Sequence, residues 1–235
     1  MSEAAQYEGV RILEAMHEAV RYNASLFDLI KQTKPATAKR ILEFGAGDGV
    51  FMGKFHGEGI AVDGVERDAQ FRGQLAERYA CRTYQDIREV DSDSADFIYS
   101  VNVLEHIENL DSEVLELRRV LKRNGSIFVF VPAFELLWTS LDDEVGHVTR
   151  FTRKTLSTAF SQGGFELTQM EYFDCLGFPA ALGVRLMEKL NMFRYQPESV
   201  RFYDRRIFPS SRYLDRFFQH AVGKNIFAVA RKAPG

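Results

Sequence analysis

The chain has 235 residues, of which 46% are hydrophobic and 27% are charged. This composition is typical of a folded globular protein and excludes disordered, collagen-like and fibrous chains. The net charge of −3 also argues against a protein that coats nucleic acid with a broad basic face.

The two cysteines, Cys81 and Cys175, fit neither a zinc-ligand spacing nor a disulfide framework. A reducing compartment is therefore expected, and no metal site is predicted. The N-terminus has no basic start followed by an apolar leader, and the longest apolar run, residues 126–138, is too short to cross a bilayer and contains Pro132. We therefore expect a cytoplasmic protein.

Apolar residues at helical spacing predict an N-terminal helix over residues 7–31. Short apolar runs after it predict five strands, at residues 40–44, 60–65, 82–84 with 86–87, 96–101 and 126–131. An amphipathic helix is predicted over 110–122, before the helix terminators Asn124 and Gly125. Strands that alternate with helices favour a doubly wound parallel sheet. Two later runs, 165–173 and 225–231, predict an antiparallel pair.

A glycine turn, Glu43-Phe-Gly-Ala-Gly-Asp-Gly49, follows the first predicted strand. Glycines let a ligand approach the backbone, and the following helix start offers free N–H groups. The dinucleotide pattern would need a third glycine at Val50, and Glu43 and Asp48 would repel a pyrophosphate. The turn therefore favours a cofactor with an ammonium and a sulfonium over a dinucleotide, the alternative being a plain tight turn. A side chain at Gly45 or Gly47 is expected to block the ligand without unfolding the chain.

The run ILEFGAGDG, residues 41–49, resembles the first motif of the class I S-adenosylmethionine-dependent methyltransferases. The resemblance implies that Glu66 holds the ribose hydroxyls, that Asp86 and Ile87 bind the adenine, and that Asn102 lies beside the methyl group. Tyr22, on the N-terminal helix, resembles a residue that some relatives place over the methionine part. The full set of implied cofactor-binding residues is Glu43, Gly45, Ala46, Gly47, Glu66, Arg67, Asp86, Ile87, Asn102 and Tyr22. Taken singly, Glu66 and Asp86 could also be solvated surface acids.

The same resemblance implies an α/β fold with a Rossmann-like, doubly wound, seven-stranded sheet, mostly parallel with an antiparallel last strand. One domain over 1–235 is expected. Its parts are a helical cap (1–35), a cofactor-binding core (36–175), an insertion (176–224), and the last strand with a tail (225–235).

Residues 141–153, LDDEVGHVTRFTR, are the best candidates for acceptor chemistry. They resemble a D-E-x-x-G-H-x-x-R segment of bacterial methyltransferases associated with cell-surface glycan or lipid assembly. The resemblance and the residue types suggest His147 as a general base, and Arg150 and Arg153 as ligands for an acceptor carboxylate or phosphate. Alternatively, His147 and Arg150 only tie the loop to its own acids. His106 is a second candidate base, and a packing role for it is at least equally favoured.

The insertion, 176–224, contains nine basic residues against four acids and nine interleaved aromatic residues. Such a segment can lie on an anionic membrane or cover a lipid-linked acceptor. It can equally form a lid or a dimer face, or present a solvated basic face over an aromatic core.

The resulting hypothesis is S-adenosylmethionine-dependent methylation of a small-molecule, glycan or lipid-linked acceptor, most readily at oxygen. Nucleic acid is not expected as a partner, since the chain lacks a base-flipping N-P-P-Y signature. A nicotinamide oxidoreductase is disfavoured by Glu43 and Val50. A protein that binds the cofactor without catalysis remains an alternative.

Overall fold

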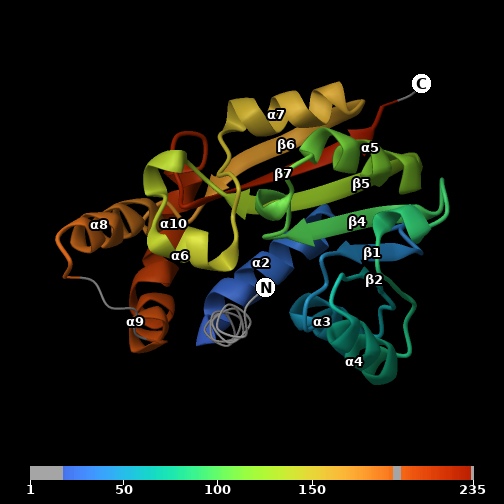
Figure 1. Ribbon diagram of the computed structural model, residues 1–235, viewed down its shortest axis with the longest axis horizontal. Helices are drawn as coiled ribbons and strands as arrows, with labels where there is room; N and C mark the ends of the chain where they lie inside the picture. The colour runs from blue at the N-terminus through green and yellow to red at the C-terminus, as the bar shows by residue number, and fades with distance from the viewer. Residues whose placement is uncertain (1–17, 193–196, 234–235) are drawn as a thin grey trace.

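The computed structural model describes residues 18–192 and 197–233. Its centre is a seven-stranded sheet in the order β3-β2-β1-β4-β5-β7-β6 (Figure 1). The strands are β1 Ile41–Phe44, β2 Asp63–Val65, β3 Thr83–Tyr84, β4 Ala95–Val101, β5 Leu121–Pro132, β6 Phe165–Phe173 and β7 Asn225–Lys232. β7 runs antiparallel to both of its neighbours, and the remaining pairings are parallel. The predicted fold class and the late antiparallel pair are therefore confirmed.

Helices cover both faces of the sheet because the strand side chains alternate between two apolar cores. In β5, Ile127 and Val129 pack on one face with α5 Leu110–Val120 and α7 Arg153–Gln162. Phe128 and Phe130 face the opposite side. That second core includes α2 Val20–Thr33, α3 Val50–Gly57 and α4 Ala69–Tyr79.

The helices between β6 and β7 gather near the carboxyl ends of β4 and β5, together with α6 Ser140–Val145 (Figure 1). They are α8 Gly177–Lys189, α9 Pro197–Phe202, a π-helical turn at Tyr203–Ile207, and α10 Phe208–Phe218. A carboxylate in the π-helical turn, Asp204, accepts hydrogen bonds from the backbone N–H groups of Arg21 (3.0 Å) and Tyr22 (2.8 Å). These bonds satisfy donors that the start of α2 leaves free, and so they fix α2 against the inserted helices.

Several predicted boundaries differ from the structure. The helix predicted at 110–122 ends at Val120, and β5 begins at Leu121, five residues before the predicted strand at 126–131. The strand predicted at 60–65 is only Asp63–Val65. The strand residues predicted at 86–87 are instead the N-cap and the first residue of the 3₁₀ helix Ile87–Glu89. The first part of the predicted N-terminal helix, residues 7–17, lies outside the described residues. Within the described ranges, no helix is both long and apolar enough to cross a membrane.

Candidate active site

The glycine turn links β1 to α3 at the carboxyl end of β1, where the strand order changes direction between β1 and β4. In open α/β sheets, ligands bind at such a switch point. Gly45, Gly47 and Gly49 have φ values of +79°, +53° and +84°, in the left-handed region that favours glycine. A Cβ on Gly47 would meet no atom within 4 Å, so the space in front of this residue is open to a ligand.

Gly45 has a different constraint from the one predicted. A Cβ on Gly45 would lie 2.2 Å from Cγ2 of Val103. A side chain at Gly45 would therefore disturb the packing of the turn against the end of β4. The close contact with Val103 argues that a substitution at Gly45 lowers stability as well as blocking a ligand, while the open space at Gly47 agrees with a ligand-facing role.

Glu66 lies directly beside this turn, at the carboxyl end of β2. Its Oε2 accepts a hydrogen bond from the N–H of Gly47 (2.7 Å), and its Oε1 accepts one from the N–H of Asp68 (2.9 Å). The neighbouring Arg67 is exposed. The structure thus brings Glu66 and Gly47 together at the carboxyl end of β2, and the side chain of Glu66 is half-buried there.

Asp86 follows β3 and caps the 3₁₀ helix Ile87–Glu89. Its carboxylate accepts hydrogen bonds from the backbone N–H and the guanidinium of Arg88. The backbone bond is the largest cause that lowers the pKa of Asp86 below its usual value. The carboxylate is therefore ionised and partly exposed, and an amine that binds it must compete with Arg88.

Three predicted cofactor residues are buried in the protein itself. Glu43 accepts a hydrogen bond from the hydroxyl of Tyr99 (2.8 Å), and burial raises its pKa to about 8. Ala46 is packed in one core, and Ile87 is completely buried in the other. Because Ile87 has no exposed surface, the predicted contact with an adenine ring would require this side chain to move.

Tyr22 lies in an aromatic cluster, and its hydroxyl donates to Oδ1 of Asn225 (2.9 Å). Its ring contacts those of Phe130, Phe173 and Phe208, with centroids between 4.9 and 6.3 Å apart. This packing joins α2 to β5, β6 and α10, so Tyr22 has a structural role independent of the cofactor contact predicted for it.

At the end of β4 the chain turns sharply toward the loop that follows β5. Asn102 has a φ of +54°, a conformation that asparagine tolerates, and its N–H donates to the carbonyl of Phe130 (2.8 Å). The next residues form the 3₁₀ helix Leu104–His106. The carbonyl of Glu105 accepts a hydrogen bond from the N–H of Val148 (2.8 Å), which brings the His147 loop to the end of β4.

Asp142 is the centre of the candidate acceptor site. Its Oδ1 is 2.7 Å from Nδ1 of His147, and Nε and Nη2 of Arg150 donate to its two oxygens at 2.8 and 3.0 Å. Burial would raise the pKa of Asp142, but the hydrogen bonds from His147 and Arg150 outweigh it and hold the pKa well below its usual value. An ionised Asp142 accepts a hydrogen bond from Nδ1–H and leaves Nε2 of His147 as the free basic nitrogen.

The two predicted acceptor arginines are both engaged within the protein. Arg150 uses two donors on Asp142 and a third on the carbonyl of Ala133. Arg153 donates to the carbonyl of His220. Arg150 and His147 therefore both contact Asp142, which is the arrangement of the alternative interpretation, in which they tie the loop to its own acids.

Glu105 was not among the predicted site residues, but it lies beside His147. Its side chain is fully buried, with Oε1 3.8 Å from Nε2 of His147. Burial raises its pKa to about 8. Glu105 and His147 lie in separate loops, so no local sequence motif predicts that they are neighbours. His106 completes the group: its ring lies 4.7 Å from that of His147. Although the residue as a whole is exposed, partial desolvation of its ring and the neighbouring His147 lower its pKa.

Known proteins resemble this chain in their sequence profile and in their fold. Residues 16–170 match the profile of a family described as a methyltransferase domain. No curated protein matches the sequence. The fold is similar to that of a SAM-dependent methyltransferase from Archaeoglobus fulgidus, with a TM-score of 0.60 and 18% identity, over 91% of this chain and 94% of that one.

Two further solved structures have the same fold. A SAM-dependent methyltransferase from Thermotoga maritima has a TM-score of 0.64 and 14% identity, over 94% of each chain. Phosphoethanolamine N-methyltransferase 2 of Haemonchus contortus, in complex with S-adenosyl-L-methionine, has a TM-score of 0.61 and 18% identity, over 91% of this chain and 52% of that longer one.

Proposed function

The chain belongs to the methyltransferase domain family, and we propose that it transfers the methyl group of S-adenosylmethionine to a hydroxyl oxygen of a small-molecule, glycan or lipid-linked acceptor. The cofactor is supported by the open space at Gly47 beside the carboxylate of Glu66. A carboxylate can accept two hydrogen bonds from a vicinal diol such as a ribose. When bound, this cofactor supplies a methyl group on a positively charged sulfur that leaves as a neutral thioether.

Transfer to oxygen is supported by one observation, the Asp142–His147 pair. A hydroxyl loses its proton as its oxygen attacks the methyl carbon, and a positioned base typically contributes about 10²–10⁴ in rate. Nε2 of His147 can take that proton, because Asp142 binds the other ring nitrogen at 2.7 Å. The negative charge of Asp142 then stabilises the imidazolium that forms.

The experiment measures cofactor affinity and turnover separately. Glu66→Gln should weaken binding of S-adenosylhomocysteine about tenfold to a hundredfold in calorimetry, since a hydrogen bond to a charged acceptor typically contributes about 1.5–3 kcal/mol. His147→Asn should leave that affinity unchanged. Turnover is measured as release of S-adenosylhomocysteine on a panel of hydroxyl and amine acceptors, and His147→Asn should reduce it at least a hundredfold on whichever hydroxyl acceptor is methylated.

Glu77→Gln is the matched control, because Glu77 is an exposed carboxylate on the helix that follows Glu66. It should behave as the wild type in both measurements. Equal affinity in Glu66→Gln and Glu77→Gln would contradict the proposed cofactor site. Methylation confined to amine acceptors, or full turnover in His147→Asn, would contradict transfer to oxygen. Cofactor binding with no turnover on any acceptor would favour the non-catalytic alternative.

A lipid-linked acceptor is supported by the surface of α8. Leu182, Leu186 and Leu190 follow one another at intervals of four residues and are exposed, with Lys189 exposed beside them. Together they make an apolar stripe with a basic flank, a pattern that suits the surface of an anionic membrane. The stripe lies near the candidate site, because Glu188 of α8 accepts hydrogen bonds from the backbone and hydroxyl of Ser140.

Vesicle sedimentation tests this contact. The wild type should sediment with vesicles that contain phosphatidylglycerol more than with pure phosphatidylcholine vesicles. The double variant Leu186→Glu/Leu190→Glu should lose this binding, because charges would replace the apolar stripe. Leu115→Glu, at an exposed leucine of α5, is the control and should bind as the wild type. Equal sedimentation of both variants would exclude α8 as a membrane contact.

A further inference from the structure

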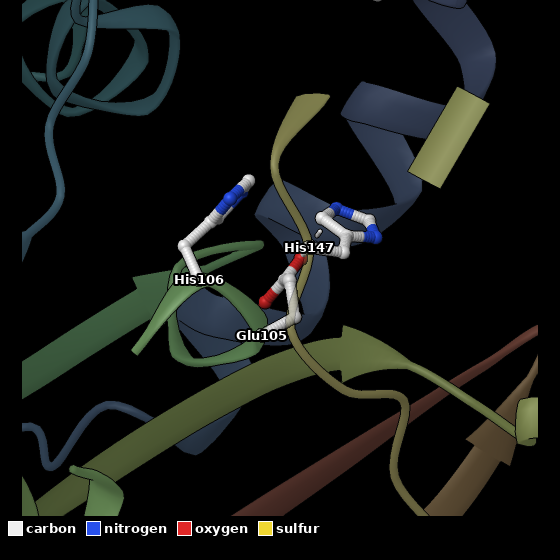
Figure 2. A group of neighbouring side chains, drawn as sticks. All are labelled: Glu105, His106 and His147. Atoms are coloured by element: carbon white, nitrogen blue, oxygen red, sulfur yellow. Dashed lines mark ion pairs between the residues drawn. The ribbon is translucent and has the colours of Figure 1, made fainter. Parts of the chain in front are cut away.

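Three side chains that can ligate a metal ion meet at the carboxyl end of β4. Glu105 and His106 come from the 3₁₀ helix after β4, and His147 comes from the loop after α6 (Figure 2). One ligand atom from each residue lies within 4.8 Å of the others. Figure 2 shows the carboxylate of Glu105 directed at His147, with the side chain of His106 beside them.

Both imidazoles are held by hydrogen bonds through Nδ1. Nδ1 of His106 is 3.1 Å from the carbonyl oxygen of Gly146, and since a carbonyl can only accept, Nδ1 carries the proton. Nδ1 of His147 is bound in the same way to the carboxylate of Asp142. In the neutral rings, each Nε2 therefore carries a free lone pair. Histidines that bind metals have this arrangement, in which a carbonyl or carboxylate fixes the second ring nitrogen.

The carboxyl group of Glu105 indicates a bound cation independently of the two histidines. Neither of its carboxylate oxygens has a hydrogen-bond partner among the described residues, although the side chain is completely buried. A buried polar group without a partner is destabilising, and this carboxyl lies next to Nε2 of His147. A cation between the carboxylate and the two imidazoles would satisfy all three groups.

We propose that Glu105, His106 and His147 bind a divalent transition-metal cation, such as Zn²⁺ or Mn²⁺. Two imidazoles and one carboxylate are a ligand set that these ions accept, and it leaves coordination positions open. With Zn²⁺ ligand distances of about 2.0–2.2 Å, the ligand atoms must move about 1 Å closer together on binding. His106 is exposed and can make this adjustment.

The inference does not depend on the proposed function, because protein side chains alone bind the cation. It does affect the role of His147, since a bound cation uses the same lone pair that would accept a proton. In the metal-bound protein, an acceptor hydroxyl at an open position would be made more acidic by the cation. Turnover after chelator treatment distinguishes these two ways of activating a hydroxyl.

The test is a calorimetric titration of chelator-treated protein with Zn²⁺, and with Mn²⁺ in parallel, without cofactor or acceptor. We expect at least one of these ions to bind as a single equivalent. Glu105→Gln, His106→Ala and His147→Ala should each weaken its binding at least tenfold. His56→Ala removes an exposed histidine of α3 and should bind as the wild type. Co²⁺ should give visible absorption bands in the wild type that His106→Ala loses.

His106 is exposed, so His106→Ala should remain folded, and a loss of metal binding in this variant can be separated from unfolding. Circular dichroism of each variant checks that it is folded. Absence of saturable binding to the wild type by either ion would overturn the proposal. So would unchanged affinity in a folded His106→Ala, or an equal loss in His56→Ala. None of these results bears on cofactor binding, which is measured separately with S-adenosylhomocysteine and Glu66→Gln.

Discussion

Single residues of the glycine turn have different physical requirements, although the sequence presents them as one motif. Gly45 lies against Val103, a Cβ on Gly49 would come within 2.5 Å of Leu75, and Gly47 faces open space. The turn could be predicted from the sequence because three glycines at alternate positions after a strand are typical of a backbone with positive φ values. The sequence could not show why Gly45 and Gly49 must each lack a side chain, since their neighbours Val103 and Leu75 come from distant segments.

These differences give a prediction for Gly45→Ala and Gly47→Ala. At Gly47 the main structural cost is the left-handed backbone, about 1–2 kcal/mol. Gly47→Ala should therefore lower the melting temperature slightly but weaken S-adenosylhomocysteine binding more than tenfold, because the new methyl group occupies ligand space. Gly45→Ala should lower the melting temperature further, since its Cβ also collides with Val103.

Gly73→Ala is the control, at a helical glycine of α4 where an added Cβ would meet nothing within 4 Å. Thermal melts and calorimetry on the three variants provide the comparison. Wild-type ligand affinity in Gly47→Ala would show that the open space at this turn is not used by the cofactor.

At the scale of elements, most strand limits were predictable from the sequence, and those of β2 and β5 were not. β4 and β6 coincide with the predicted runs to within one residue, because buried strands leave a continuous or alternating apolar pattern. β2 has only three residues, and its limits depend on pairing with β1 and β3. β5 begins directly after α5 because Leu121 pairs with Ala95, a contact that the sequence does not contain.

The candidate site shows the same limit. His147 and Asp142 are close in sequence, so their pairing could be anticipated. Glu105 joins them only because the N–H of Val148 donates to its carbonyl and brings two separate loops together. Sequence patterns describe local structure well, while the meeting of β4 and the loop after β5 is a property of the sheet order.

For the whole molecule, buried carboxyl groups make stability depend on pH. Glu43 has a folded-state pKa of about 8, against an ordinary value of 4.5, because burial disfavours its charged form. Below both values the carboxyl is protonated in the folded and unfolded chain, and it adds no pH dependence. Between them the unfolded chain releases this proton while the folded protein retains it. Stability attributable to this group therefore falls as pH rises from about 4.5 to about 8.

Glu43→Gln should remove this contribution while its amide oxygen still accepts the hydrogen bond from Tyr99. Urea unfolding at several pH values between 5 and 8 should therefore give a shallower decline for Glu43→Gln than for the wild type, by up to about 1.4 kcal/mol per pH unit. The comparison isolates Glu43, because Glu105, whose pKa is also raised to about 8, is present in both proteins. Glu77→Gln, at an exposed site, should give a curve parallel to the wild type. Parallel curves for Glu43→Gln and the wild type would mean that Glu43 is already ionised in the folded protein near neutral pH, with its charge stabilised by Tyr99 and the start of α3.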